Sequence, residues 1–266
     1  MSTHSEPVGT VYLVGAGPGA PDLLTLRAAR LLAQADIVFY DALVHPQTLE
    51  LAVRAERIAV GKRCGKHSTA QRFINKRLVD AAQTHAIVVR LKGGDPMLFG
   101  RAQEEIAALE AAGVAYEVVP GVTAALAAAA QVRTSLTQRG SVRSVALITP
   151  RVGADEKPNP WIDSVASADA AAIYMGAGEA EAISAALIAA GKDPGMPVAL
   201  VESASLPESR THYTTLARLP ALEGRAFSGP VMLLLGPQFH ARAARRADEE
   251  ARDSPASAEI AARSNR

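Results

Sequence analysis

The sequence predicts an α/β protein made of two α/β domains. In the first half, short apolar strands alternate with helical segments, the pattern of a parallel sheet with helices on both faces. In the second half strands outnumber helices, which predicts a mixed sheet. A chain of 266 residues fits two domains of ordinary size or one large domain. We expect an N-terminal domain at 9–122, a C-terminal domain at 123–238 and a polar tail at 239–266.

The composition narrows the classes of function. Hydrophobic residues make up 48% and aromatic residues only 4%, which favours helices packed on sheets over an aromatic surface for nucleic acid. The net charge of +1 provides no global field toward nucleic acid or membrane. The single cysteine, Cys64, excludes an internal disulfide and a cysteine-based metal cluster. With no transmembrane run and no apolar signal core at 1–7, we expect a soluble, cytoplasmic protein.

Strands and helices of the first half are marked by apolar runs and by helix-end residues. The expected strands are 10–14, 37–40, 57–60, 86–91 and 116–119. Asp22 is the expected N-cap of the first helix. Ser68 and Gln71 have the spacing of a capping box at the start of a second helix. The helix at 102–112 stops at Gly113, a residue suited to the position after a helix.

The second half begins with an alanine-rich helix at 123–130. Its expected strands are 145–149, 171–175, 198–202, 212–215 and 231–235. A helix at 179–190 ends at Gly191. The segment 152–160 is rich in Pro, Asp and Asn and is expected to be a solvated loop.

The most informative stretch of the sequence is 88–101, where an expected buried strand is followed by a glycine loop and then by a helix. Gly93 and Gly94 permit positive φ or the close approach of a ligand, and Pro96 fixes one further φ angle. Parallel α/β proteins bind ligands at such strand ends. An ordinary βα turn is the alternative for a single Gly-Gly-Asp-Pro.

A second glycine turn, Gly15-x-Gly17-x-x-Ala20, fits the dinucleotide fingerprint and raises the possibility of a nicotinamide-dependent oxidoreductase. Pro18 and Pro21 argue against it, because each removes an amide donor that a pyrophosphate needs at the helix start.

Charged residues follow several strand ends. Asp41 is either a turn aspartate or a carboxylate that accepts a proton from a substrate. Three cations, Lys62, Arg63 and Lys66, share one loop, and Arg101 adds a fourth positive charge. The group suits a small polyanion, carboxylate or phosphate, although a basic loop can also be plain solvated surface. Histidines show no metal-ligand spacing, and Met175 at a strand end is expected to pack in the core.

Four motifs together resemble the tetrapyrrole methylases. They are Val11-Tyr-Leu-Val-Gly-Ala-Gly-Pro-Gly19; Tyr40-Asp-Ala-Leu-Val44 with Gly61-Lys-Arg-Cys-Gly65; Val89-Arg-Leu-Lys-Gly-Gly-Asp-Pro96 through Phe99-Gly-Arg101; and Val119-Pro-Gly-Val-Thr-Ala124. The similarity extends from about 9 to 236, and within the family it is greatest to enzymes that methylate uroporphyrinogen III.

The resemblance implies a non-Rossmann architecture in which S-adenosylmethionine binds in a cleft between the two domains. It also implies a homodimer, without metal, that methylates uroporphyrinogen III twice to give precorrin-1 and then precorrin-2. By position it assigns Asp41 as a base, Lys62 as an acid and Arg101 as a substrate contact. The positions assigned to the cofactor are Pro18, Gly93, Gly94, Asp95, Leu98, Thr123, Ala124, Met175 and Ala204.

The chemistry suits these residues, because a sulfonium methyl is electrophilic and the enzyme must mainly align the acceptor carbon and accept a proton. Other hypotheses remain: a later precorrin or cobalt-precorrin as acceptor, the nicotinamide-dependent oxidoreductase, and a relative that binds tetrapyrroles without catalysis.

Overall fold

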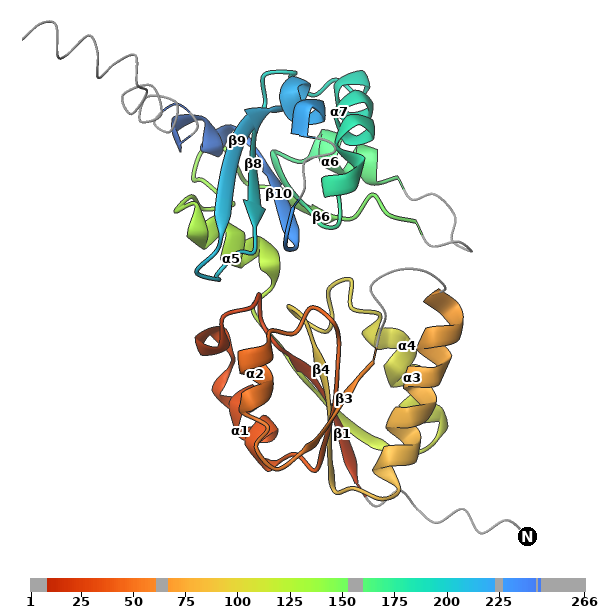
Figure 1. Ribbon diagram of the computed structural model, residues 1–266. Helices are drawn as coiled ribbons and strands as arrows, with labels where there is room; N and C mark the ends of the chain where they lie inside the picture. The colour runs from red at the N-terminus through yellow and green to blue at the C-terminus, as the bar shows by residue number, and fades with distance from the viewer. Residues whose placement is uncertain (1–8, 61–66, 153–159, 223–226, 243, 245–266) are drawn as a thin grey trace, which may run out of the picture. The chain divides into compact units, whose positions relative to one another are not determined.

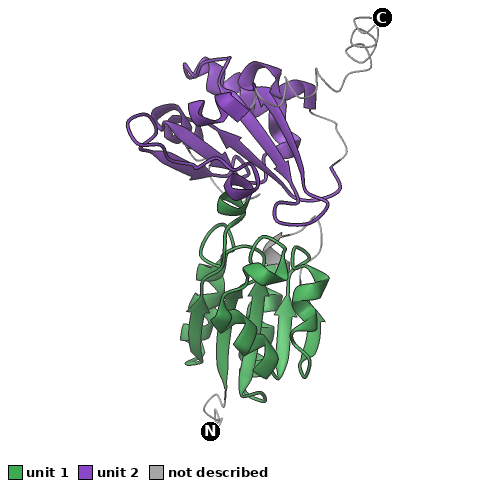
Figure 2. Cartoon of the chain, turned by 90° about the vertical axis from the view of Figure 1, so that its left-hand side faces the viewer, with its two compact units in different colours: residues 1–127 green, residues 128–266 purple. Residues whose placement is uncertain are grey.

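The computed structural model describes residues 9–60, 67–152, 160–222, 227–242 and 244. The chain divides into two compact units, residues 1–127 and 128–266 (Figure 2). Each unit has its own five-stranded sheet, so each is considered by itself.

The sheet of the first unit is entirely parallel. Its strands are β1 (Thr10–Gly15), β2 (Ile37–Tyr40), β3 (Glu56–Ala59), β4 (Ile87–Lys92) and β5 (Ala115–Val119). They lie in the order β3-β2-β4-β1-β5. Strand β1 therefore lies between β4 and β5, whereas a Rossmann sheet places β1 between β2 and β4. The predicted parallel, non-Rossmann α/β fold is confirmed.

Helices cover both faces of this sheet (Figure 1). One face packs against α3 (His67–Ala82) and α4 (Ala102–Ala111) through Leu13, Phe39, Leu78 and Leu109. The other face packs against α1 (Leu26–Gln34) and α2 (Pro46–Glu50), with Val38, Val89 and Leu91 in its core. Successive residues of a strand point to opposite faces, so Arg90 and Lys92 share the α3 and α4 side with Val88.

The helix ends can be compared with the capping residues predicted from the sequence. Gly113 follows α4 with φ +65°, as expected for a C′ glycine. Gly113 N donates to Glu110 O, and Val114 N donates to Leu109 O. Asp22 as an N-cap was wrong. Pro21–Leu23 form a short 3-10 helix, and α1 starts later, with Thr25 Oγ1 accepting from Ala28 N at 3.1 Å.

The proposed capping box was also wrong. Helix α3 begins at His67, which places Ser68 inside the helix. Gln71, the other member of the box, is buried, and its Nε2 donates to side chains of α3 and α4 rather than to the helix start.

The second unit has the expected mixed sheet, in the order β6-β7-β10-β8-β9. The strands are β6 (Val145–Ile148), β7 (Ala170–Ile173), β8 (Pro197–Glu202), β9 (Arg210–Thr215) and β10 (Val231–Leu235). Strands β6 and β7 are parallel, and β10 runs antiparallel to both β7 and β8. Consequently β6, β7 and β8 all end at the same edge of this sheet.

The helices of the second unit are α5 (Ala124–Gln131), which begins in the first unit, α6 (Trp161–Ser167) and α7 (Ala180–Ala189). Helices α6 and α7 and the 3-10 helix Leu216–Leu222 supply side chains to one core with β7, β8 and β10. Gly191 follows α7 with φ +91°, so the predicted helix end is confirmed. The sequence reading missed α2 and α6, and most of the expected loop at 152–160 lies outside the described residues.

We predict that Thr25→Ala destabilises the chain by about 1 kcal/mol, because Ala28 N loses its capping acceptor. Asp22→Ala is the matched control and should leave stability unchanged. Urea unfolding followed by circular dichroism measures both. A larger loss of stability in the Asp22 variant would show that Asp22 caps the helix after all.

Candidate functional site

The candidate site of the first unit lies at the edge where the parallel strands end. The glycine turn after β1, Asp41 after β2, the loop 93–101 after β4 and the segment 120–123 after β5 all leave the sheet there. The parallel arrangement thus brings together segments that are far apart in the sequence.

Three of these loops contact one another through their backbones. Gly17 N donates to Gly94 O at 3.1 Å, and Gly94 N donates to Gly17 O at 2.7 Å. A Cβ on Gly15 would lie 2.6 Å from the Cα of Gly121, and one on Gly121 would lie 2.3 Å from Gly94 O. Side chains are therefore excluded at Gly15 and Gly121, and the loops meet only because glycine is present.

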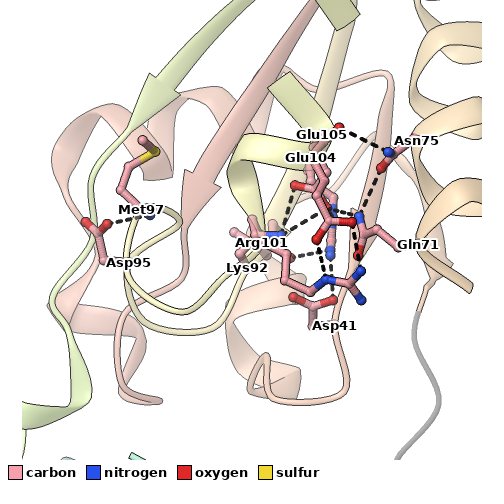
Figure 3. Close-up of polar contacts among 11 residues, drawn as sticks. Asp41, Gln71, Asn75, Lys92, Asp95, Met97, Arg101, Glu104 and Glu105 are labelled. Carbon is pink, nitrogen blue, oxygen red and sulfur yellow. Dashed lines mark hydrogen bonds and ion pairs between the residues drawn. The ribbon is translucent and has the colours of Figure 1, made fainter. Parts of the chain in front are cut away.

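Asp95 connects two of the same loops. Its Oδ1 accepts from Met97 N at 2.8 Å (Figure 3). Its Oδ2 accepts from Gly121 N at 2.9 Å. Both carboxylate oxygens are thus engaged by backbone amides. The contacts assign Asp95 a role in holding the loop after β4 against the segment after β5.

The rest of the loop after β4 has unusual backbone geometry. Phe99 and Arg101 have φ +55° and +56°, a left-handed conformation that is uncommon for residues other than glycine. Strained residues of this kind cluster at functional sites. The Arg101 guanidinium pairs with Glu104 at 2.6 Å, and both side chains are exposed. Leu98, in the same loop, is half-buried.

The other positions assigned to the cofactor in this unit follow β1 and β5. Pro18 comes directly after Gly17 and is half-buried. Thr123 and Ala124 are half-buried at the start of α5, where Thr123 O accepts from Leu126 N and Ala127 N. Lys62, Arg63 and Lys66 lie outside the described residues.

Beside these loops lies a network of buried charges that the sequence reading missed (Figure 3). Arg90 Nη2 donates to Asp41 Oδ1 at 2.6 Å, and Arg90 Nε donates to Glu105 Oε1 at 2.9 Å. Lys92 Nζ lies 3.0 and 2.9 Å from the two oxygens of Glu105. Arg90 and Lys92 are 2% exposed, Glu105 is fully buried, and Asp41 is 29% exposed.

Amide side chains of α3 complete the network. Gln71 Nε2 donates to Glu105 Oε1 at 3.2 Å and to Asn75 Oδ1 at 2.9 Å. Asn75 Nδ2 in turn donates to the Glu104 backbone carbonyl at 3.0 Å. Helices α3 and α4 are therefore joined to each other and to the ends of β2 and β4 by polar contacts.

The surroundings shift the pKa values of Arg90 and Lys92 in opposite directions. Burial tends to lower the pKa of Arg90, but the negative charges of Asp41 and Glu105 outweigh it, so the pKa lies above its ordinary value. Burial and repulsion from Arg90 lower the pKa of Lys92, although Glu105 opposes both effects. Glu105 is thus the counter-charge that the two cations share.

The second unit holds the remaining predicted cofactor positions. Met175 follows β7 and is 45% exposed, so the expectation that it packs in the core was wrong. Ala204 follows β8 and is buried. Met175, Ser203 and Ser205 have φ +58°, +49° and +76°. The strained turns after β7 and β8 lie at the same edge of their sheet.

Glu202, the last residue of β8, holds the segment 228–229 that precedes β10. Its Oε1 accepts from Ser228 Oγ at 2.9 Å and from Gly229 N at 3.0 Å, while Ser203 N donates to Pro230 O. Burial tends to raise the pKa of Glu202, but these hydrogen bonds outweigh it and the pKa lies below its ordinary value.

The geometry disfavours the nicotinamide interpretation of the first glycine turn. Both backbone polar groups of Gly17 are bonded to Gly94, so they are not offered to a pyrophosphate. Helix α1 begins only at Leu26, well after the turn, whereas dinucleotide sites place a helix N-terminus directly at the phosphates.

Two further classes of function can be considered for the part of the chain that the structure describes. No group of three or more His, Cys, Asp or Glu side chains there could hold a metal ion. No helix within the described ranges is both long enough and apolar enough to cross a membrane.

Comparison with known proteins identifies the family. Residues 10–220 match the model of the Tetrapyrrole (Corrin/Porphyrin) Methylases, so the chain belongs to this family. A siroheme synthase of Azotobacter vinelandii is 47% identical over 233 residues, which are 87% of this chain and 50% of that protein. The chain thus spans about half the length of the curated relatives it matches.

Solved structures show the same fold. A uroporphyrin-III C-methyl transferase from Thermus thermophilus, complexed with S-adenyl homocysteine, is 39% identical with a TM-score of 0.76. The match covers 88% of this chain and 100% of that one. A cobalt precorrin-4 methyltransferase is 28% identical with a TM-score of 0.73, covering 85% of this chain and 94% of that one.

We predict that Glu105→Gln lowers the free energy of unfolding by about 3–5 kcal/mol, because two buried cations lose their shared counter-charge. Asp80→Asn, which removes the carboxylate of the exposed Lys76–Asp80 pair, is the control and should have little effect. Chemical denaturation measures both. Equal, small losses would show that Glu105 does not stabilise the network.

For Glu202 we predict a stability contribution that disappears in acid. Its pKa is lowered on folding, so the contribution is complete above the ordinary value of 4.5 and is lost as the pH falls through the folded value. Glu202→Gln should therefore be less stable than the wild type at neutral pH. The difference in melting temperature should narrow as the pH falls below 4.5. A difference independent of pH would contradict this.

Proposed function

We propose that the chain is an S-adenosylmethionine-dependent C-methyltransferase that methylates uroporphyrinogen III twice, giving precorrin-1 and then precorrin-2 for sirohaem or cobalamin synthesis. The observation that carries the proposal is the 39% identity to the Thermus thermophilus enzyme over its entire chain, against 28% for the cobalt precorrin-4 methyltransferase. We further propose that it works as a homodimer in the cytoplasm.

The loops of the first unit suit the donor. Gly94 has φ +68°, and a Cβ built on it would meet no atom within 4 Å, so its backbone borders open space that a ligand can approach. We assign Pro18, Gly93, Gly94, Asp95 and Leu98 to the donor. Thr123 and Ala124, with Met175 and Ala204 of the second unit, complete the assigned set. Bound S-adenosylmethionine would supply the electrophilic methyl group.

The polar residues of the same edge suit the acceptor. Uroporphyrinogen is a polycarboxylate, and the guanidinium of Arg101 can bind a carboxylate through two nitrogens. A substrate carboxylate would replace Glu104 as its partner, which costs little because that pair is exposed. Lys62 is retained as a proposed acid.

Asp41 is the proposed base. Its Oδ1 is held by Arg90, and its side chain remains 29% exposed at the sheet edge. Methylation of a ring carbon must be followed by loss of a proton from the macrocycle, and a carboxylate fixed in position can accept it. Alignment of the acceptor with the methyl group supplies the remainder of the catalysis.

Incubation of the purified chain with S-adenosylmethionine and enzymatically prepared uroporphyrinogen III tests the proposal. We expect a product that has gained two methyl groups by mass and absorbs as precorrin-2. Parallel incubations with later precorrins and cobalt-precorrins test the alternative acceptors. Methylation of one of those instead, or binding of uroporphyrinogen III without transfer, would overturn the proposal.

We predict that Asp41→Asn lowers kcat by about 10²–10⁴-fold and leaves S-adenosylhomocysteine affinity unchanged, because the amide cannot act as a base while its oxygen can still accept from Arg90 Nη2. Steady-state kinetics and calorimetric titration measure the two quantities. Asp80→Asn is the control for loss of an acidic group away from the sheet edge. If kcat and affinity fell together, Asp41 would have a structural role instead.

Asp95→Asn is predicted to weaken S-adenosylhomocysteine binding about tenfold or more. The amide can still accept from Met97 N, but its NH₂ group would face the Gly121 N–H, so one buried donor is left unsatisfied and the loops separate. Asp193 makes a corresponding turn contact to Gly195 N at 2.8 Å, so Asp193→Asn is the matched control. Unchanged affinity in the Asp95 variant would show that the loop contact is unimportant for the donor.

A further inference from the structure

We propose that Arg90 is a positioning residue that orients the carboxylate of Asp41, and that Glu105 fixes Arg90 in turn. The inference rests on the proposed role of Asp41 as the base. It assigns a role to three buried charged residues that the proposed mechanism does not otherwise use.

The hydrogen bonds of Arg90 fix the plane of its guanidinium. Nη2 donates to Asp41 Oδ1 at 2.6 Å, Nε donates to Glu105 Oε1 at 2.9 Å, and Nη1 donates to Leu91 O at 3.2 Å. Each of its three nitrogens therefore has its own acceptor, and the acceptors come from a strand end, a helix and the backbone of β4. A planar group held at three points cannot rotate without breaking at least one of these bonds.

Burial shows which member of the network can act on a substrate. Arg90 and Lys92 are 2% exposed and Glu105 is fully buried, whereas Asp41 is 29% exposed. Among these four charged side chains, only Asp41 is appreciably exposed. The three buried groups can influence a substrate only through the position of this one carboxylate.

Lys92 completes the balance of charge. Two cations and two carboxylates form the network, and Lys92 Nζ contacts both oxygens of Glu105. Glu105 is thereby held in one orientation as the support for Arg90 Nε. Gly100 also packs against the Lys92 stem, since a Cβ there would lie 3.2 Å from Lys92 Cε.

Stability alone does not explain why charges occupy this place. Arg90 is paired in register with Phe39 and Leu13, on the face of the sheet that packs against α3 and α4. Replacing a buried ion pair by apolar residues is often neutral or stabilising by about 1–4 kcal/mol. Orientation of the partly exposed Asp41 carboxylate is a function that apolar residues could not provide.

A double-mutant cycle between Arg90→Lys and Asp41→Asn tests the inference. Lysine keeps the positive charge but has a single nitrogen, so it cannot bind Asp41 and Glu105 in the same geometry. We expect Arg90→Lys to lower kcat about ten- to hundredfold with KM and S-adenosylhomocysteine affinity unchanged. In the Asp41→Asn background it should have no further effect on kcat. Arg57→Lys, at an exposed arginine of β3, is the matched control.

An equal loss of kcat in both backgrounds would contradict the inference, because Arg90 would then act independently of Asp41. Crystal structures of the wild type and of Arg90→Lys provide a readout that needs no activity. We expect the Asp41 carboxylate to rotate or shift in the variant, and an unchanged carboxylate would overturn the positioning role. If the wild type does not methylate uroporphyrinogen III, the proposed function fails, while the crystallographic comparison still decides the role of Arg90.

Discussion

All five strands of the first sheet run in the same direction, so their carboxyl ends meet at one edge and deliver four separate segments to it. Two kinds of contact then fix these segments. The backbones of three loops meet at Gly15, Gly94 and Gly121, and a side chain at Gly15 or Gly121 would collide there. A few residues away, buried charges hold Asp41. The same edge therefore offers open backbone to one ligand and a fixed carboxylate to another, as a group transfer between two molecules requires.

The glycine junction and the charge network respond to different kinds of substitution. The glycine junction depends on the absence of atoms, and a single added methyl group disturbs it. The charge network depends on balance, since loss of Glu105 leaves Asp41 as the one carboxylate in the network for two buried cations. In the second unit Gly229 packs against a side chain instead of a backbone, since a Cβ there would lie 2.0 Å from Ser203 Oγ. The turns after β7 and β8 likewise combine strain with close packing.

Local patterns predicted the parts of the fold that local interactions determine. The strands fell close to their expected ranges, and Gly113 and Gly191 ended their helices because a left-handed residue is needed there. Asp22 failed as a cap because Pro21 opens a separate 3-10 helix, a distinction that capping preferences do not make. The short helix α2 lacks the length for a clear periodicity.

The buried network shows where sequence reasoning reached its limit. Arg90 and Lys92 lie two residues apart in a central strand, so they share one face, and Glu105 lies one turn into the helix that covers that face. Two cations on one face of an apolar strand were a visible signal, but their partners depend on how α4 packs. Met175 was misjudged for the same reason, since exposure after a strand depends on the turn that follows.

We propose that the methyl donor binds at the glycine-lined edge of the first sheet, next to Asp41. A crystal structure of the chain with S-adenosylhomocysteine is the decisive experiment. Ligand density is expected against the backbone of Gly93 and Gly94, with Asp95 still bonded to Gly121. Ligand density away from this edge, or an Asp41 carboxylate turned away from the ligand, would contradict it.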